Sequence, residues 1–224
     1  MTTIYICMLD FEATCWDDDG KSRNKMEVIE FPSIIIKWNL KTGKSERVSE
    51  FQRYCKPKSF PQLSKFCTEL TGITQETVNK GVTFSQALKD HEAWMAKTIP
   101  NFYYEENVYI MTCGRWDIDI QLPRDLKNWN IHSVNRVYKR FINLKSEFQY
   151  FLKEKRGRGL ANMLKFMNLK LEGKHHSGIE DCRNQTKILE ELIKRGMKGN
   201  DMKIEYVSKK KYGKNNNNYQ KRNF

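Results

Sequence analysis

The stretch Ile4-Tyr5-Ile6-Cys7-Met8-Leu9-Asp10-Phe11-Glu12 decides the fold, because an unbroken apolar run ends on two closely spaced acids. Apolar and β-forming residues that continue without alternation are typical of a strand buried on both faces. Side chains on a strand alternate between its faces, so Asp10 and Glu12 are expected to point the same way while Phe11 enters the core. The segment therefore predicts a central strand that carries a pair of carboxylates at its end.

Two carboxylates that share one small space repel each other. At about 4 Å and an effective dielectric near 20, this repulsion is about 4 kcal/mol. The pair relieves it by holding a proton or by recruiting a cation, and oxygen ligands of this kind suit Mg²⁺ or Mn²⁺ better than zinc. The alternative is a solvated strand end, which is the commoner origin of an isolated D-x-E pattern.

A third acidic position follows the next strand-like run of the sequence. Residues 108–113 read Val-Tyr-Ile-Met-Thr-Cys, and Asp117 comes shortly after the turn residue Gly114. This composition predicts a strand that ends in a turn. Because open α/β sheets bind ligands at the edge where their strands end, Asp117 is expected to lie near Asp10 and Glu12.

A histidine and a fourth acid stand further along, in His176-Ser177-Gly178-Ile179-Glu180-Asp181. A helix is expected from about 179 to 195, which places Asp181 in its first turn, where the helix dipole favours an anion. His176 belongs to the preceding loop, and Gly178 is expected to free the backbone so that both side chains face one cavity. His175 is a competing candidate, and an exposed loop histidine is the alternative reading of either residue.

The remaining segments follow the alternating order of an α/β domain. The expected elements are strands over 28–39 and 48–54, short helices over 63–70 and 74–79, a longer helix opened by the capping box Thr83-x-x-Gln86, and a helix over 158–167.

These motifs together resemble the DEDDh exonucleases, the superfamily that includes RNase T and proofreading exonucleases. The residues of these motifs are most similar to those of the histone-mRNA and RNA-interference-associated 3′ exoribonucleases and their Snipper-like members. The matching stretches are residues 9–16, 66–75, 116–117 and 176–181, in the same order.

The resemblance implies a three-layer α/β/α ribonuclease H-like fold, with a mixed central sheet opened by three meander strands. It implies a 3′–5′ exoribonuclease that hydrolyses terminal phosphodiesters to nucleoside 5′-monophosphates with two Mg²⁺ ions, for which Mn²⁺ can substitute. It also implies roles for particular side chains. Asp10, Glu12, Asp117 and Asp181 are expected as metal ligands, with Glu12 and His176 as the catalytic residues and His176 as the general base.

Substrate contacts are also expected from the resemblance. The backbone at Ala13 and Thr14 and the region from Leu70 to Ile73 would line the pocket of the terminal nucleotide. Trp116 would either stack on a base or belong to the core. Arg115 departs from the family pattern, where an acid or serine is common, and its charge is expected to alter phosphate affinity.

Composition is compatible with a nucleic-acid partner. The 224 residues include 40 Lys and Arg against 27 Asp and Glu, a net charge of +13. Such an excess attracts polyanions, although it specifies none. We expect an exonuclease domain over 1–200 and a basic, Asn/Lys-rich tail over 201–224 with the composition of disorder. The resemblance to this family alone favours RNA 3′ ends over DNA as the substrate. The alternatives are a basic RNA-binding or adaptor protein on an exonuclease fold and a single-stranded DNA 3′ exonuclease.

The cysteines and the hydropathy bear on location. The six cysteines form no C-x-x-C pair, so reduced thiols in a cytoplasmic or nuclear protein are expected. No apolar stretch reaches membrane-spanning length and no secretory signal is recognisable, so we expect no transmembrane segment and no secretion.

Overall fold

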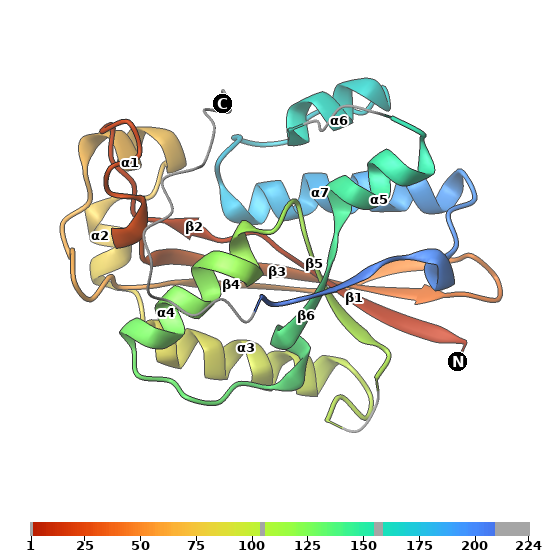
Figure 1. Ribbon diagram of the computed structural model, residues 1–224, viewed down its shortest axis with the longest axis horizontal. Coiled ribbons are helices and arrows are strands. Elements are labelled where there is room, and N and C mark those ends of the chain that lie inside the picture. The colour runs from red at the N-terminus through yellow and green to blue at the C-terminus, as the bar shows by residue number, and fades with distance from the viewer. Residues whose placement is uncertain (1, 104–105, 155–158, 209–224) are drawn as a thin grey trace.

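A computed structural model describes residues 2–103, 106–154 and 159–208, and within these ranges one mixed sheet forms the centre of the fold (Figure 1). Its strands are β1 (Thr3–Leu9), β2 (Glu12–Ala13), β3 (Val28–Asn39), β4 (Ser45–Tyr54), β5 (Val108–Thr112), β6 (Arg140–Asn143) and β7 (Ile204–Tyr206). β1 pairs antiparallel with β3 and parallel with β5. β4 pairs antiparallel with β3, which completes the expected three-strand meander of β1, β3 and β4, and the short β2 pairs with the start of β3.

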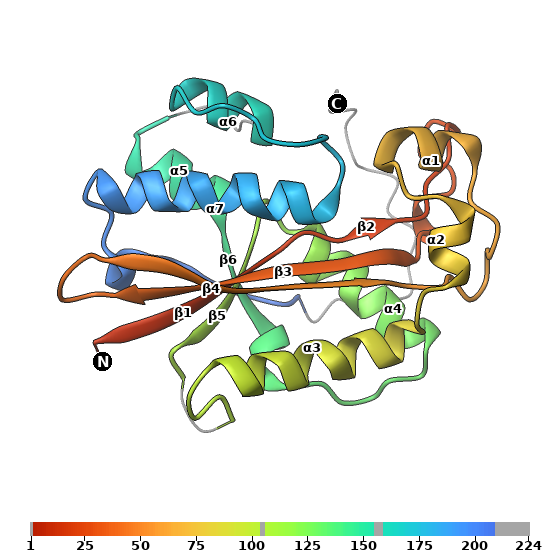
Figure 2. The same cartoon turned by 180° about the vertical axis from the view of Figure 1, so that it is seen from behind.

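Helices cover both faces of this sheet. They are α1 (Lys65–Thr71), α2 (Gln75–Asn79), α3 (Phe84–Thr98), α4 (Leu122–Asn128), α5 (Leu144–Phe151), α6 (Leu160–Phe166) and α7 (Gly178–Lys194). In Figure 2, α5, α6 and α7 lie on one side of the strands and α3 lies on the other, while α1 and α2 stand at the end of the sheet beyond β2. The three-layer α/β/α arrangement predicted from the sequence is confirmed.

The unbroken apolar run of β1 is explained by its two covered faces. Tyr5, Cys7 and Leu9 belong to the core cluster that includes residues of α3 and α4. Ile4, Ile6 and Met8 belong to the cluster formed with α5, α6 and α7. Fully burying a large apolar side chain contributes about 1.5 to 3 kcal/mol, so both faces of β1 stabilise the fold.

The expected helix starts are close to the observed ones. Thr83 caps α3 by accepting the Gln86 backbone N–H at 3.1 Å, but the Gln86 side chain bonds to Asp90, so only half of the capping box forms. α1 begins two residues later than expected because Ser64 is its N-cap and accepts the Cys67 N–H.

The C-terminal part of the described chain returns to the sheet. Residues 204–206, inside the segment expected as a tail, form β7 and pair antiparallel with β6. Residues 209–224 of that tail, and 155–158 at the expected start of α6, lie outside the described residues. In the described ranges, no helix has both the length and the apolar character needed to cross a membrane.

Candidate active site

The two acids after β1 lie at the carboxyl end of the central strand. Phe11 between them is buried and packs edge-on against Phe31, with ring centroids 4.7 Å apart. Asp10 and Glu12 are half-buried, and Glu12 begins β2, where it pairs with Glu30 of β3. The alternation expected from the sequence therefore holds, with the aromatic ring in the core and the two acids outside it.

Asp117 reaches the same edge from the neighbouring parallel strand. β5 ends at Thr112, and a π-helical turn, η2 (Trp116–Gln121), carries Asp117 with only 4% of its surface exposed. Its Oδ1 accepts the backbone N–H of Phe11 at 2.9 Å. This bond joins η2 to the chain between Asp10 and Glu12. Asp117, which is distant from them in sequence, therefore lies beside these two acids.

Asp181 lies in the first turn of α7, with 3% of its surface exposed. Its carboxylate accepts the backbone N–H of His176 at 3.0 Å, and the His175 Nδ1 lies 3.1 Å from both carboxylate oxygens. The structure therefore brings the ring of His175, rather than that of His176, into hydrogen-bond contact with Asp181. The two imidazole rings stack, with centroids 4.1 Å apart.

The prediction that Gly178 frees the backbone of the loop is wrong. Within the motif from His176 to Asp181, the left-handed backbone is at His176, whose φ is 66°, and Gly178 itself has no positive φ. Gly178 is instead pressed against the sheet, because a Cβ there would lie 2.8 Å from the carbonyl oxygen of Asp10 and 2.8 Å from Pro32 Cγ. The glycine allows close packing of α7 rather than freedom of the loop.

The charges of these acids act on one another. Burial, followed by the charges of Asp117 and Asp181, raises the pKa of Asp10 well above its usual range. Burial and the charge of Asp10 likewise raise the pKa of Glu12. Burial raises the pKa of Asp117 to about 6, although the Phe11 N–H opposes the shift. A site that holds its carboxylates this way favours protons or cations.

Oxygen-rich, mutually repelling carboxylates are a suitable donor set for Mg²⁺ or Mn²⁺. Within the described part of the chain, His175, His176 and Asp181 form the one group of three potential ligands whose atoms all lie within 4.8 Å of one another. Among the described residues, no three of the acids Asp10, Glu12, Asp117 and Asp181 form such a group.

Two charged residues near the site were missed by the sequence reasoning. Lys145 follows β6 in the first turn of α5. Its ammonium opposes the rise in the pKa of Asp10 and in that of Asp117. Glu30 lies in β3 beside Glu12, and its charge raises the pKa of both Asp10 and Glu12. A signal for Glu30 was present, because an acid inside the apolar run of residues 28–36 is rarely buried without partners.

The expected substrate residues are mostly buried. Ala13 and Thr14 are 4% and 1% exposed, and the Thr14 N–H is donated to the Glu27 carbonyl. Ile73 packs in a small cluster with Cys67 and other apolar residues, whereas Leu70 is half-buried. Their side chains are thus largely engaged inside the protein.

Trp116 and Arg115 both have partners within the fold. Trp116 is partly buried against the core cluster of α3 and α4. Arg115 forms ion pairs with Asp119, at 3.0 Å, and with Glu205 of β7. The positive charge of Arg115 is therefore compensated by two acids other than Asp117.

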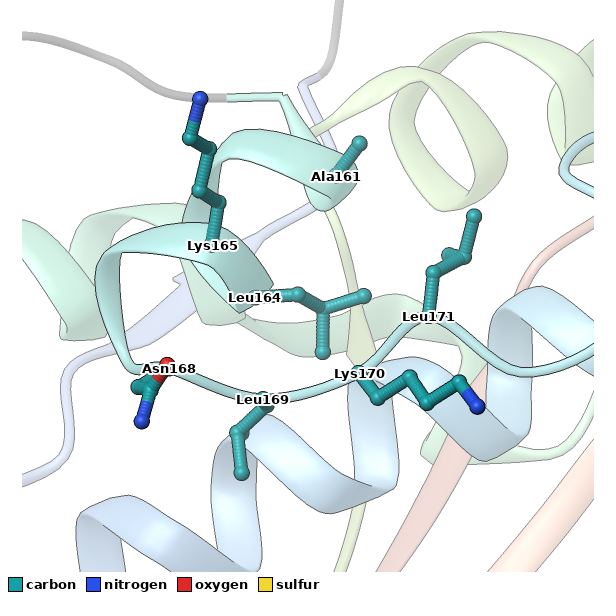
Figure 3. Close-up of a pocket in the computed structure, with 7 residues that line it drawn as sticks. All are labelled: Ala161, Leu164, Lys165, Asn168, Leu169, Lys170 and Leu171. Atoms are coloured by element: carbon teal, nitrogen blue, oxygen red, sulfur yellow. The ribbon is translucent and has the colours of Figure 1, made fainter.

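A surface pocket of about 370 Å³ lies away from the acidic residues, beside α6 (Figure 3). It is lined by Ala161, Leu164, Lys165, Asn168, Leu169, Lys170 and Leu171. None of the expected site residues lines this pocket.

Comparison with known proteins shows which family this chain belongs to. The profile of the exonuclease family named for RNase T matches residues 7–189. The chain is 38% identical over 195 residues to ERI1 exoribonuclease 3 of Homo sapiens, covering 86% of this chain and 54% of that protein. It thus spans about half the length of that relative.

Two further comparisons cover more of the matched protein. The 3′-5′ exonuclease Snipper of Drosophila melanogaster is 32% identical over 203 residues, covering 86% of this chain and 70% of Snipper. The solved nuclease domain of 3′hExo, a DEDDh family member bound to rAMP, superposes with a TM-score of 0.79 at 30% identity, covering 91% of this chain and 97% of that one. Since both the profile and the superposition span most of the chain, this protein belongs to the RNase T family of DEDDh exonucleases.

Proposed function

We propose that this protein is a divalent-metal-dependent 3′–5′ exoribonuclease that releases nucleoside 5′-monophosphates one at a time. The observation that carries the proposal is the meeting of Asp10, Glu12 and Asp117 at one edge of the sheet with the α7 start that bears Asp181. These elements are far apart in sequence, so their meeting depends on the fold. The activity is assigned to residues 1–208, which extends the domain expected over 1–200 so that it includes β7, and the basic tail is assigned to the residues that follow.

Four carboxylates are proposed to hold the metal: Asp10, Glu12, Asp117 and Asp181. When bound, two Mg²⁺ ions, or Mn²⁺ in their place, would activate the attacking water and stabilise the departing 3′ oxygen. The carboxylates supply the negative charge that retains such ions. Asp117 and Asp181 keep fixed orientations because each accepts a backbone N–H, from Phe11 and His176 respectively.

His176 is proposed as the general base, which takes the proton of the attacking water. Burial, together with the neighbouring His175, lowers the pKa of His176, so its imidazole is neutral at pH 7 and able to accept a proton. The ring of His175 is instead engaged by Asp181, whose two carboxylate oxygens both lie 3.1 Å from its Nδ1, which makes His175 the weaker candidate for a base. Stacking of the two rings holds His176 beside the acids.

RNA is the proposed substrate. Relatives of this chain include exoribonucleases, one solved relative binds rAMP, and another recognises the 3′ end of a histone mRNA stem-loop. The net charge of +13 favours a polyanionic partner. We place the terminal nucleotide against Leu70, Ile73 and Trp116, with the backbone of Ala13 and Thr14 beside it. A cytoplasmic or nuclear location suits the six free cysteines.

The test is degradation of matched, 5′-labelled single-stranded RNA and DNA. A ladder that shortens from the 3′ end of RNA, and that slows when the RNA ends in a 3′-phosphate, is expected. Cuts within a circular RNA would refute the exonuclease assignment. Preference for DNA would make the protein a single-stranded DNA 3′ exonuclease, and binding without turnover would make it an RNA-binding adaptor.

A further inference from the structure

Glu30 is a buried acid that neither the sequence motifs nor the proposed metal site includes. It lies inside β3, only 1% exposed, directly across from Glu12 of β2. Charged side chains are almost never buried this deeply unless they are paired. No ion pair with a cation accounts for Glu30 in the described residues, so its partners must be hydrogen-bond donors.

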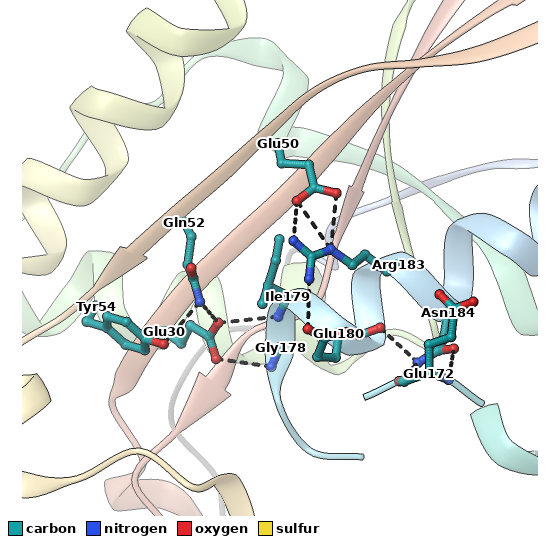
Figure 4. Close-up of polar contacts among 10 residues, drawn as sticks. All are labelled: Glu30, Glu50, Gln52, Tyr54, Glu172, Gly178, Ile179, Glu180, Arg183 and Asn184. Atoms are coloured by element: carbon teal, nitrogen blue, oxygen red, sulfur yellow. Dashed lines mark hydrogen bonds and ion pairs between the residues drawn. The ribbon is translucent and has the colours of Figure 1, made fainter. Parts of the chain in front are cut away.

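Those donors come from two elements that flank β3. Glu30 Oε2 accepts the Gly178 backbone N–H at 3.0 Å, and Oε1 accepts that of Ile179 at 3.3 Å (Figure 4). The Gln52 side-chain amide on β4 donates to Oε1 at 2.7 Å and also lies 3.1 Å from the Tyr54 hydroxyl. The carboxylate of one strand therefore joins the neighbouring strand to the start of α7.

The start of α7 has no cap of its own. Ser177 occupies the N-cap position but makes no side-chain hydrogen bond to the helix. The first backbone N–H groups of a helix lack intrahelical acceptors and normally take them from such a cap. Glu30 supplies these acceptors from 148 residues away, and its negative charge is placed where the helix dipole favours it.

The contacts of Glu30 determine where α7 begins relative to the acidic site. Gly178 is held between the Glu30 carboxylate and the carbonyl of Asp10, with no room for a Cβ. Asp181 follows one helical turn later, and His176 precedes by two residues. Any displacement of the Gly178 backbone therefore moves both of these side chains relative to Asp10.

A second anchor lies one turn further along α7 but is weaker. Arg183 bridges Glu50 of β4 at 2.6 Å and Glu180 at 2.7 Å (Figure 4). More than a third of the Arg183 and Glu50 side chains is exposed, and exposed ion pairs are strongly screened by water. The buried Glu30 contacts therefore dominate the position of the helix start.

We propose that Glu30 is a positioning residue, which sets the start of α7 and thereby places Asp181 and His176 for metal binding and proton transfer. Both of its oxygens are occupied by N–H donors, so it acts through α7 rather than as a further ligand. This inference rests on the proposed function, and it adds to that function a residue that touches neither substrate nor reacting atoms.

The direct test is Glu30→Gln, assayed well below the melting temperature. The introduced NH₂ would face an N–H donor of α7 or of Gln52, so the cap is disrupted at almost unchanged volume. Partners that orient metal ligands typically cost about 10- to 100-fold in metal affinity or activity when altered. We expect a loss of that size in kcat, a matching rise in the Mn²⁺ concentration for half-maximal activity, and weaker Mn²⁺ binding by calorimetry, with KM for RNA little changed.

Glu147→Gln is the matched control. Glu147 of α5 is also buried, at 4% exposure, and accepts one backbone N–H, from Lys203 at 2.9 Å. Its substitution should lower the melting temperature without changing kcat or Mn²⁺ binding. If Glu30→Gln behaves in the same way, Glu30 is a structural residue only and the proposal is overturned.

Two further variants guard against misfolding and test the polarity of the contact. Exchange of the pair, Glu30→Gln with Gln52→Glu, restores a donor opposite an acceptor between positions 30 and 52 but leaves one α7 N–H facing the introduced NH₂, so it should recover little of the lost kcat and Mn²⁺ affinity. Full recovery of both would show that the contact with Gln52, rather than the cap of α7, is what matters, and would contradict the proposal. If Glu30→Gln shows no cooperative melting, Gln52→Leu removes the orienting donor, and unchanged Mn²⁺ binding in that variant would overturn the inference.

The proposed function and the role of Glu30 can fail separately. Wild-type protein that degrades no RNA or DNA at any Mn²⁺ concentration would refute the proposed function. Calorimetric Mn²⁺ affinities of the wild type and Glu30→Gln would then still decide whether Glu30 positions Asp181.

Discussion

Removal of one acid from the candidate active site should stabilise the metal-free protein while it abolishes activity. Asp117→Asn is the suitable change, because an amide oxygen can still accept the Phe11 N–H. The pKa of Asp117 is raised from 3.8 to about 6. About two pH units at 1.36 kcal/mol each give a penalty of up to about 3 kcal/mol for ionised Asp117 at pH 7.5. For a chain of this size, this corresponds to a melting temperature higher by about 6 to 12 °C.

The sign of the pH dependence follows from linkage. Between pH 4 and 6 folded Asp117 holds a proton that the unfolded chain has lost, so its contribution to wild-type stability falls as pH rises. The stabilisation by Asp117→Asn should therefore be full at pH 7.5, about half at pH 5 and nearly absent at pH 4. The assay is thermal melting in EDTA, with the exposed Asp201→Asn as control. A variant no more stable than wild type at pH 7.5, or a gain independent of pH, would refute this electrostatic reasoning.

Three other predictions concern single side chains. His176→Ala should lower kcat by about 10²- to 10⁴-fold and keep metal-induced stabilisation, whereas His175→Ala should lower kcat less. A larger loss of single-turnover rate in His175→Ala than in His176→Ala would assign the base to His175. The pKa of buried His91 is lowered to about 3, so protonation favours the unfolded chain, and the free energy of unfolding should fall by about 1.4 kcal/mol per pH unit below pH 6.5. Urea titrations from pH 4 to 7 should show this pH-dependent fall in the free energy of unfolding in wild type and not in His91→Phe. Equal slopes of unfolding free energy against pH in the two proteins would exclude it. Gly178→Ala should cost about 1 to 3 kcal/mol and reduce kcat, since its Cβ would meet the Asp10 carbonyl; unchanged melting and turnover would contradict the close packing.

The sequence predicted the elements whose signals are local. β1 was recognisable because helices cover both of its faces, which requires an apolar side chain at every position. The start of α3 was recognisable because Thr83 and the N–H that it accepts are three residues apart. The acids Asp10, Asp117 and Asp181 could be proposed as site residues because their motifs follow the order found in a known family.

Contacts between distant residues were not predictable in this way. Glu30 caps a helix that begins 148 residues later, so no local pattern marks its partner. The exposed or buried state of Thr14 and Ile73 depends on packing around β2 and α1 that the motif alone does not encode. Which of the two adjacent histidines contacts Asp181 depends on the turn that contains them, where His176 has a positive φ and the His175 ring lies against Asp181.

The most direct test of the central claim is the dependence of RNA degradation on the acids and on divalent metal together. Wild type, Asp10→Asn and the exposed control Asp201→Asn should be incubated with 5′-labelled RNA in Mg²⁺ and in EDTA. The account predicts stepwise 3′ shortening and release of nucleoside 5′-monophosphates by wild type and Asp201→Asn in Mg²⁺ only, with none by Asp10→Asn. Equal degradation in EDTA, or by Asp10→Asn in Mg²⁺, would contradict it.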